Sequence, residues 1–302
     1  MIPPAQTRFG LEHPLVTVKD HARTLQLYIR MGFSPSPVSY HPWGTVTSLM
    51  MFRNNFIELI GVDDATKFGT NSVNGFCFGR QLGSFLERGE EGISLVALHS
   101  KDADKDYEDL TTAGLAGQGR IDFRRRMTLP DGSPDEAVVS LGLFIDEQQP
   151  DISNFICHQH KPELIWVPGW QHHPNGVDAI VAVTWLADPA SLVERWKTFY
   201  GENVVLKDGV LTAETGYGQL RAMDQETAEK HYPGIPLPER KEPGAHGIAI
   251  TLNTHKPDDL KLILEHQNIP FSEFSDRILV APDWTGNVIF EFITGIQEGD
   301  QL

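Results

Sequence analysis

Basic residues are scarce in this sequence, and cysteine is nearly absent. The 302 residues include 25 Lys and Arg against 41 Asp and Glu, a formal net charge of −16 at pH 7. Such an acidic surface repels phosphate backbones and anionic lipid headgroups, so we expect neither a nucleic-acid nor a membrane partner. The two cysteines, Cys77 and Cys157, form no closely spaced pair, which argues against a disulfide framework and against a zinc knuckle.

Long apolar runs and several catalytic motifs are also missing. No stretch approaches the roughly 18 apolar residues of a membrane span, and the opening MIPPAQTRFG lacks the basic and apolar segments of an export signal. We therefore expect a protein of the reducing cytoplasm. There is no GxSxG, P-loop, GxGxxG or HExxH pattern, so nucleophilic hydrolysis, nucleotide binding and zinc-protease chemistry have no support in the sequence.

The sequence instead contains one pattern repeated four times. Each copy has a short apolar run, an Asp or Pro able to start a helix, an amphipathic helix closed by Gly or Asn, and two or three further apolar runs. The four helix starts are Asp20, Asp102, Asp188 and Pro257. Their spacings of 82, 86 and 69 residues are too long for a solenoid repeat and suit a βαβββ module.

Helix caps and strand patterns support four such modules. Asp20 can cap a helix in which Leu25 and Tyr28 share a face and which ends at Gly32. A length of 302 residues favours two domains, each with two paired modules. The stretch rich in Pro, Gly and His before residue 177 is the natural boundary, so residues 1–165 are predicted to form the N-terminal pair and residues 177–302 the C-terminal pair.

Three segments resemble the vicinal oxygen chelate (VOC) superfamily and its glyoxalase-like domain group. LEHPLVTVKDHARTLQLYIRMGF resembles that superfamily's opening strand and helix, NNFIELIGV its closing strand in the first module, and TGNVIFEFITG the corresponding strand in the fourth. The resemblance implies an α+β fold of the glyoxalase, bleomycin-resistance and dioxygenase type. In that fold the four modules form two incomplete barrels of eight strands each, with a divalent metal held by residues from first and last strands.

Two residues are candidates for that metal. His13 occupies the superfamily's first ligand position, and Glu58 is a charge among apolar neighbours on a predicted buried strand, where charges usually have a partner or a metal. Two His and one carboxylate with open positions would suit Fe(II) or Mn(II), with Zn as an alternative. In the other interpretation Glu58 is a solvated residue on an open face.

The third ligand is less defined. Period-two alternation places His158 and His160 on one face of their strand, and Cys157 and Gln159 on the other. We assign His160 to the metal and His158, with Glu58, to proton transfer. The alternative places both histidines in a loop that leaves the barrel.

The second module pair departs further from the pattern. Its matching first-strand position lies near Ala179, which cannot bind metal, and only His246 and Glu291 remain as candidate ligands there. We therefore expect the second pair to be structural, as a lid or as the half that forms a homodimer, although the alternative of a second site stays open.

Other residues suggest how a substrate is held. Arg124 and Arg126, in the only basic run, share a face by alternation and could clamp a substrate carboxylate, although a solvated sheet face is the other interpretation. Trp43, near a predicted hairpin, could wall the pocket.

The resulting functional hypothesis is a metal-dependent enzyme for a small, oxygen-rich molecule. A ring-cleaving dioxygenase for an aromatic diol is slightly favoured, because four modules in about 300 residues match that class in the superfamily. A glyoxalase-like lyase or isomerase that uses the same metal is the first alternative. A metal-free protein that binds or sequesters a small molecule is the second.

Overall fold

The computed structural model describes residues 8–129 and 131–294. The start of the predicted N-terminal domain (residues 1–7) and the end of the predicted C-terminal domain (residues 295–302) lie outside these residues. Sixteen strands form one continuous open sheet. The first module consists of β1 (Leu11–Thr17), α1 (His21–Arg30), β2 (Ser39–Tyr40), β3 (Thr45–Met51) and β4 (Phe56–Val62). The second consists of β5 (Gly92–His99), α3 (Ala103–Thr112), β6 (Gly119–Thr128), β7 (Pro134–Phe144) and β8 (Asn154–Gln159).

The other two modules repeat this order. The third consists of β9 (Val177–Leu186), α4 (Pro189–Tyr200), β10 (Val204–Lys207), β11 (Val210–Glu214) and β12 (Gln219–Met223). The fourth consists of β13 (His246–Thr254), α6 (Pro257–His266), β14 (Phe271–Glu273), β15 (Arg277–Val280) and β16 (Ile289–Ile293). The predicted α+β fold of four βαβββ modules is confirmed.

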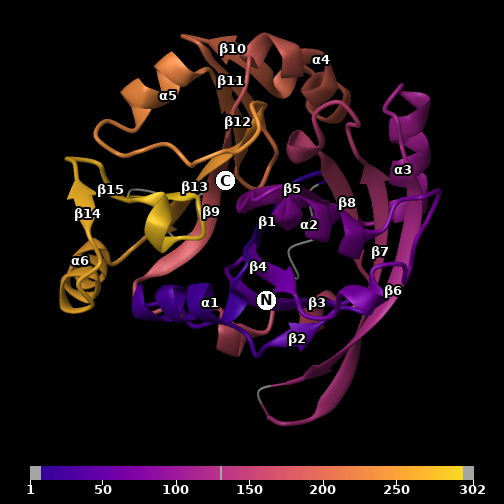
Figure 1. The fold of residues 1–302 in the computed structure, drawn as a ribbon, viewed down its shortest axis with the longest axis horizontal. Coiled ribbons are helices and arrows are strands. Elements are labelled where there is room, and N and C mark those ends of the chain that lie inside the picture. The colour runs from indigo at the N-terminus through magenta and orange to yellow at the C-terminus, as the bar shows by residue number, and fades with distance from the viewer. Residues whose placement is uncertain (1–7, 130, 295–302) are drawn as a thin grey trace.

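Pairing between first strands joins the modules two by two. β1 runs antiparallel to β5, and β9 antiparallel to β13, while the last strand of each module lies parallel to its first strand. Each pair therefore contributes eight strands that curve into an incomplete barrel. The four first strands meet in the middle of the molecule, and α3, α4 and α6 lie around its outside (Figure 1).

A single close contact links the two barrels through the sheet. Gly247 of β13 pairs with Ile93 of β5, and a Cβ atom on Gly247 would lie 2.6 Å from the Cβ of Ile93. Glycine is thus favoured here because the Ile93 side chain occupies the space that a Cβ atom would need. The largest cluster of buried apolar side chains also crosses between barrels, since it contains Tyr28, Phe144 and Trp185, one from each of the first three modules.

Two helices were not predicted from the sequence. α2 (Phe78–Glu87) lies between the first and second modules, and α5 (Gln225–His231) between the third and fourth. α2 buries Phe78 and Leu82 in the apolar cluster of the N-terminal barrel, so it closes one side of that barrel.

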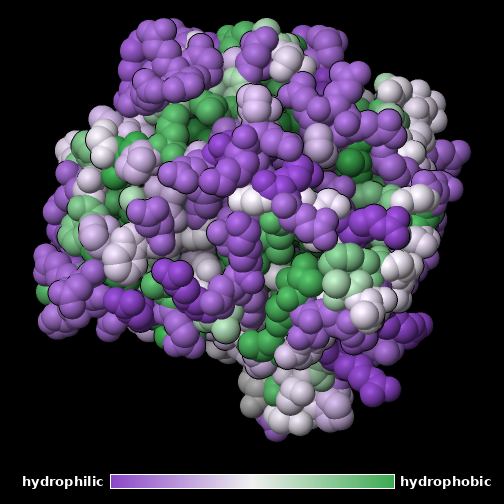
Figure 2. Space-filling view, viewed as in Figure 1, coloured by the Kyte–Doolittle hydropathy of each residue, from purple (hydrophilic) through white to green (hydrophobic). Residues whose placement is uncertain are grey.

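The surface agrees with the acidic composition. Polar residues cover most of the face shown in Figure 2, and apolar residues appear there only in patches. Among the described residues, no helix combines the length and the apolar character needed to cross a bilayer.

Candidate functional site

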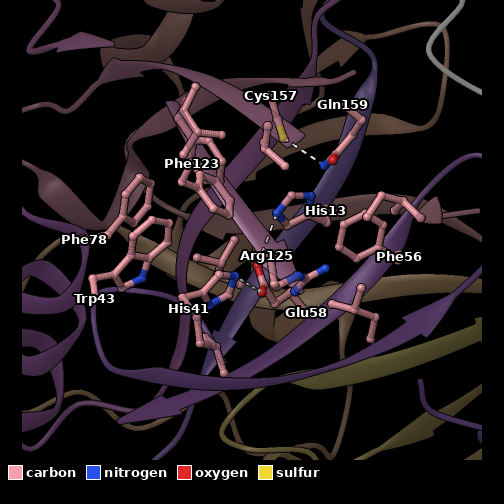
Figure 3. Close-up of a pocket in the computed structure, with 17 residues that line it drawn as sticks. His13, His41, Trp43, Phe56, Glu58, Phe78, Phe123, Arg125, Cys157 and Gln159 are labelled. Atoms are coloured by element: carbon pink, nitrogen blue, oxygen red, sulfur yellow. Dashed lines mark hydrogen bonds and ion pairs between the residues drawn. The ribbon is translucent and has the colours of Figure 1, made fainter. Parts of the chain in front are cut away.

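The N-terminal barrel encloses a cavity with a volume of about 50 Å³, room for a few water molecules or a small ligand. Its wall is largely apolar and aromatic, with contributions from β1, β3, β4, β6, β7, β8 and α2. Six side chains bring polar atoms or sulfur to it: His13, His41, Glu58, Arg125, Cys157 and Gln159. Figure 3 shows them gathered around one space between the aromatic rings. Such a wall with a few convergent polar groups is typical of a small-molecule site.

Glu58 is the centre of this polar group, and it is 6% exposed. Its carboxylate accepts a hydrogen bond of 2.8 Å from the Thr47 hydroxyl. One carboxylate oxygen lies 3.4 Å from His13 Nε2 and the other 3.6 Å from His41 Nε2. Burial alone would raise the pKa of Glu58, yet hydrogen bonding to His13 and the positive charge of Arg125 help to lower it to about 2.

His13 reaches Glu58 because β1 contains a β-bulge. The register of β1 against β5 shifts between Leu11 and His13, so that Glu12 is an extra residue, and bulges of this kind redirect side chains beside functional sites. The His13 ring stacks on Phe56, with centroids 4.2 Å apart. Burial alone would lower the pKa of His13, but hydrogen bonds to Glu12 and Glu58 raise it above its ordinary value.

Glu12 is a site residue that the sequence analysis missed. It is fully buried, its carboxylate lies 3.4 Å from His13 Nδ1 and 3.1 Å from His99 Nδ1, and the Gln159 amide donates to it at 3.0 Å. Burial alone would raise the pKa of Glu12, but the charges and hydrogen bonds of both histidines lower it to about 2. The signal was available, since Glu12, like Glu58, is a charge inside an otherwise apolar strand.

His41 brings a second imidazole to Glu58. Its Nδ1 lies 2.9 Å from the Thr45 hydroxyl, and its ring stacks on Trp43 with centroids 4.9 Å apart. Burial lowers the pKa of His41 to about 4, so this imidazole is neutral near pH 7. Trp43 lines the cavity, where the sequence placed it.

The structure corrects the side of β6 that faces the cavity. Arg124 and Arg126 share a face, but that face is exposed, and Arg124 pairs with Glu136 at 2.9 Å. Arg125, between them, is 8% exposed and lines the cavity. The apolar residues Ile121, Phe123 and Met127 lie on the inward side of the strand with Arg125, and their spacing was the signal that could have identified it.

The same correction applies to β8. Cys157 and Gln159 line the cavity, whereas His158 and His160 lie on the other face with their rings stacked 4.0 Å apart. His160 Nε2 lies 2.7 Å from the Ser140 hydroxyl, outside the cavity. The structure therefore brings His13 and Glu58 together, and it separates both from His158 and His160.

The C-terminal candidates do not meet either. His246 Nδ1 lies 2.9 Å from the Gly244 carbonyl oxygen. Glu291 instead binds Arg277 at 2.8 Å and accepts a hydrogen bond of 2.7 Å from the Thr251 hydroxyl. Glu291 thus has a structural partner of opposite charge.

Comparison with known proteins identifies the family. The glyoxalase-like domain family matches residues 11–200. The chain belongs to this family. It is accordingly a member of the VOC superfamily, and no curated protein matches it.

Three solved structures share the VOC fold of this glyoxalase-like protein. A hypothetical protein from Staphylococcus aureus has 12% identity and a TM-score of 0.66, with 95% of this chain and 100% of that chain covered. A mutant of 4-hydroxymandelate synthase from Streptomyces coelicolor has 9% identity and a TM-score of 0.54, with 98% and 95% covered. A fusion of a xylose isomerase-like TIM barrel with 4-hydroxyphenylpyruvate dioxygenase has 14% identity and a TM-score of 0.53. The match covers 99% of this chain and 51% of the fusion protein.

The resemblance implies a divalent metal held by residues from first and last strands. Glu58 aligns with Leu15 across β4 and β1, as Cys157 aligns with His99 across β8 and β5. By this register Cys157 is the counterpart of Glu58, and Ala97, two residues before His99, is the counterpart of His13. His13 also pairs directly with Ala97. The second module therefore offers a methyl group and a thiol where the first offers an imidazole and a carboxylate.

These donors do not fit a divalent metal. Burial raises the pKa of Cys157 well above its usual value, so a metal would have to displace the proton of a buried thiol before it could bind the thiolate. The cationic Arg125 lines the same cavity and would repel a second cation. No three His, Cys, Asp or Glu side chains within residues 8–129 and 131–294 converge on a metal position. The Fe(II), Mn(II) or Zn ion thus stays a prediction from the resemblance.

Glu12→Gln is expected to lower the free energy of unfolding by about 3 kcal/mol at pH 7, because a buried carboxylate between two histidines is lost. With a folded pKa of about 2 against 4.5, Glu12 stabilises the fold above pH 4.5, and this contribution is lost as the pH falls through 2. Urea unfolding at pH 7 and pH 3 should therefore show a smaller deficit at pH 3. Glu147→Gln, at an exposed residue, should change the free energy of unfolding at neither pH. If Glu12→Gln lost as much stability at pH 3 as at pH 7, the low pKa of Glu12 would be contradicted.

Proposed function

We propose that this protein is an enzyme of the lyase or isomerase type that moves a proton on a small, oxygen-rich molecule inside the N-terminal barrel. The observation that carries the proposal is the close approach of His13 and Glu58, 3.4 Å apart, within an enclosed and mostly apolar cavity. An acid and a base that lie side by side at the wall of one cavity can act on two neighbouring atoms of a small substrate, as proton transfer next to a carbonyl group requires.

The two residues have complementary roles. The raised pKa of His13 keeps its imidazolium available near neutral pH, where it can hydrogen-bond to a substrate oxygen and stabilise the negative charge that develops there. Glu58 accepts the proton from the neighbouring carbon. The electron pair of that C–H bond moves into the enolate, so the step needs no oxidant.

The low pKa of Glu58 in the empty cavity is compatible with this role. Hydrogen bonding to His13 is the strongest influence that lowers the pKa of Glu58. A substrate oxygen that takes over the His13 hydrogen bond removes that influence, and the carboxylate becomes a stronger base in the complex. His41, 3.6 Å from the other carboxylate oxygen, positions Glu58 and is the alternative proton acceptor.

Ring cleavage with a metal is the second candidate. One observation favours it, because the two imidazoles of His13 and His41 and the carboxylate of Glu58 lie in one cavity. The metal would supply a Lewis acid and bind neighbouring substrate oxygens. The missing ligands of the second module and the positive charge of Arg125 place this candidate behind metal-free proton transfer.

The test is solvent deuterium exchange, followed by proton NMR, on a panel of small oxo acids, ketones and aldehydes with a C–H bond next to the carbonyl group. The wild type is expected to accelerate exchange in at least one compound, with no loss after chelator treatment. Glu58→Gln should reduce the rate about 100-fold, in the range of general acid–base catalysis. The exposed Glu265→Gln should have no effect.

Two results would overturn the proposal. Stoichiometric iron or manganese in the purified wild type, lost in Glu58→Gln, would establish the metal-dependent candidate. Tight binding of a panel compound with no exchange would instead establish a protein that only binds its ligand.

A further inference from the structure

The cavity of the N-terminal barrel contains a guanidinium group that lacks an acceptor. Arg125 is 8% exposed, and no described residue accepts a hydrogen bond from it or forms an ion pair with it at contact distance. Its longer-range electrostatic partner is Glu58.

The guanidinium of Arg125 keeps access to solvent through the cavity, since none of its nitrogens is among the fully buried atoms without a partner. Two other groups of the cavity wall are such atoms: the indole N–H of Trp43 and the amide oxygen of Gln159, on residues that are 3% and 7% exposed. Because nearly all buried polar groups have partners, these two groups and the unpaired guanidinium indicate a ligand that carries several oxygen atoms.

We infer that Arg125 binds the carboxylate of the substrate, and that the substrate is a short monocarboxylic acid with a 2-oxo or 2-hydroxy group. The planar fork of a guanidinium matches a carboxylate through two parallel hydrogen bonds. This inference rests on the proposed function, because His13 and Glu58 supply the groups that meet the second oxygen.

Arg125, His13 and Glu58 line one cavity of about 50 Å³. A carboxylate at Arg125 and an oxygen that accepts a hydrogen bond from His13 must therefore belong to one small molecule. A molecule with the two oxygen functions on adjacent carbon atoms is small enough for this space. In Figure 3 the side chains of His13, Arg125 and Glu58 lie between the rings of Trp43 and Phe123 on one side and that of Phe56 on the other.

The size of the cavity limits the rest of the molecule. About 50 Å³ accommodates only a few non-hydrogen atoms. Arg125, His41 and Leu49 also line an outer cleft of about 550 Å³, so the carboxylate would bind where the two spaces meet. A longer acid would extend its chain into this cleft, with its reactive end still inside the barrel.

The experiment measures dissociation constants by calorimetry for 2-oxobutanoate, 2-hydroxybutanoate and the neutral 2-oxobutanamide. The wild type is expected to bind both acids at least about 10-fold more tightly than the amide, as a hydrogen bond to a charged group implies. Arg125→Gln should weaken acid binding about 10- to 100-fold and leave amide binding unchanged. The acid affinity of Arg125→Lys should lie between those of the wild type and Arg125→Gln, because lysine keeps the positive charge but cannot form two parallel hydrogen bonds with a carboxylate.

The matched control is Arg23→Gln, an exposed arginine of α1 that lines neither the cavity nor the outer cleft, and it should leave all three constants within about twofold. Equal affinity of the wild type for acid and amide, or failure to bind either acid, would overturn the inference even if Arg125→Gln did not fold. Acid selectivity that survives in Arg125→Gln would overturn it as well. Acid selectivity without deuterium exchange would leave this inference standing and remove only the proposed catalysis.

Discussion

Replacing Arg277 with alanine is expected to lower the free energy of unfolding by roughly 3–5 kcal/mol, the usual cost of removing one partner from a buried ion pair. Arg277 on β15 donates to Glu291 at 2.8 Å and to the backbone carbonyl of His231 at 2.7 Å. Glu291 is 2% exposed and would be left as an uncompensated buried charge. The substitution would also remove a hydrogen bond that links α5, whose last residue is His231, to the C-terminal barrel.

The stability lost in Arg277→Ala should become smaller as the pH falls. Burial alone would raise the pKa of Glu291, but hydrogen bonds from His231 and Thr251 and the charge of Arg277 help to lower it to about 2. Its contribution is therefore complete above an unfolded value of 4.5 and is lost as the pH falls through 2. Without Arg277 the carboxyl group protonates more easily, so the difference between variant and wild type should shrink between pH 5 and pH 3.

Urea unfolding at pH 7 and pH 3 measures both effects. Glu291→Gln combined with Arg277→Met removes both charges together and should recover most of the lost stability, because an apolar pair often replaces a buried ion pair at little cost. The surface substitution Lys197→Ala should cost less than about 0.5 kcal/mol. A double variant no more stable than Arg277→Ala would show that the cost arises from lost packing.

The fold could be predicted because local signals repeat in each module. Asp20, Asp102 and Asp188 each accept a hydrogen bond from a backbone N–H in the first turn of the helix that they precede, as the sequence predicts. Such caps depend on neighbours within three residues. α2 and α5 lie outside the four modules, between the first and second and between the third and fourth, so the βαβββ pattern did not predict them.

The site could be predicted only in part, because alternation groups residues without saying which group faces inward. On β8 the histidines were placed inward on chemical grounds, and on β6 the outer arginines were chosen as a pair. Packing decided otherwise in both strands, since Phe155 and Phe123 line the cavity on the same faces as Cys157 and Arg125. The apolar residues of a strand fix its inward face more reliably than its polar ones.

Long-range register was the other missing information. The contact between Glu12 and His99 depends on a bulge in β1 relative to β5, and no local pattern in either strand encodes that shift. The convergence of His13 and Glu58 could be anticipated because the resemblance to the VOC superfamily supplied the register that the residues alone did not.

The division of the chain into two domains stays a prediction, and the shared core supplies a test of it. Tyr28 of α1 packs against Phe290 of β16 with ring centroids 5.2 Å apart, and the Tyr28 hydroxyl donates to the backbone carbonyl of Thr285 at 2.8 Å. α1 packs on β3 and β4 of the N-terminal barrel, and its residue Tyr28 also contacts the C-terminal barrel. Stability should therefore be shared between the two halves.

Phe290→Ala is accordingly expected to destabilise both barrels by about 3–5 kcal/mol, the typical cost of removing a buried phenyl ring. Phe290 is fully buried, with Tyr28, Phe33 and Phe292 as ring neighbours. Native-state hydrogen exchange should show faster opening of β4 and β16 by the same factor, since the two strands lose protection in one cooperative transition. Leu262→Ala, at a side chain that is 53% exposed, should leave both strands unchanged. Loss of protection confined to β16 would mean that the barrels unfold separately, as the predicted domain boundary implies.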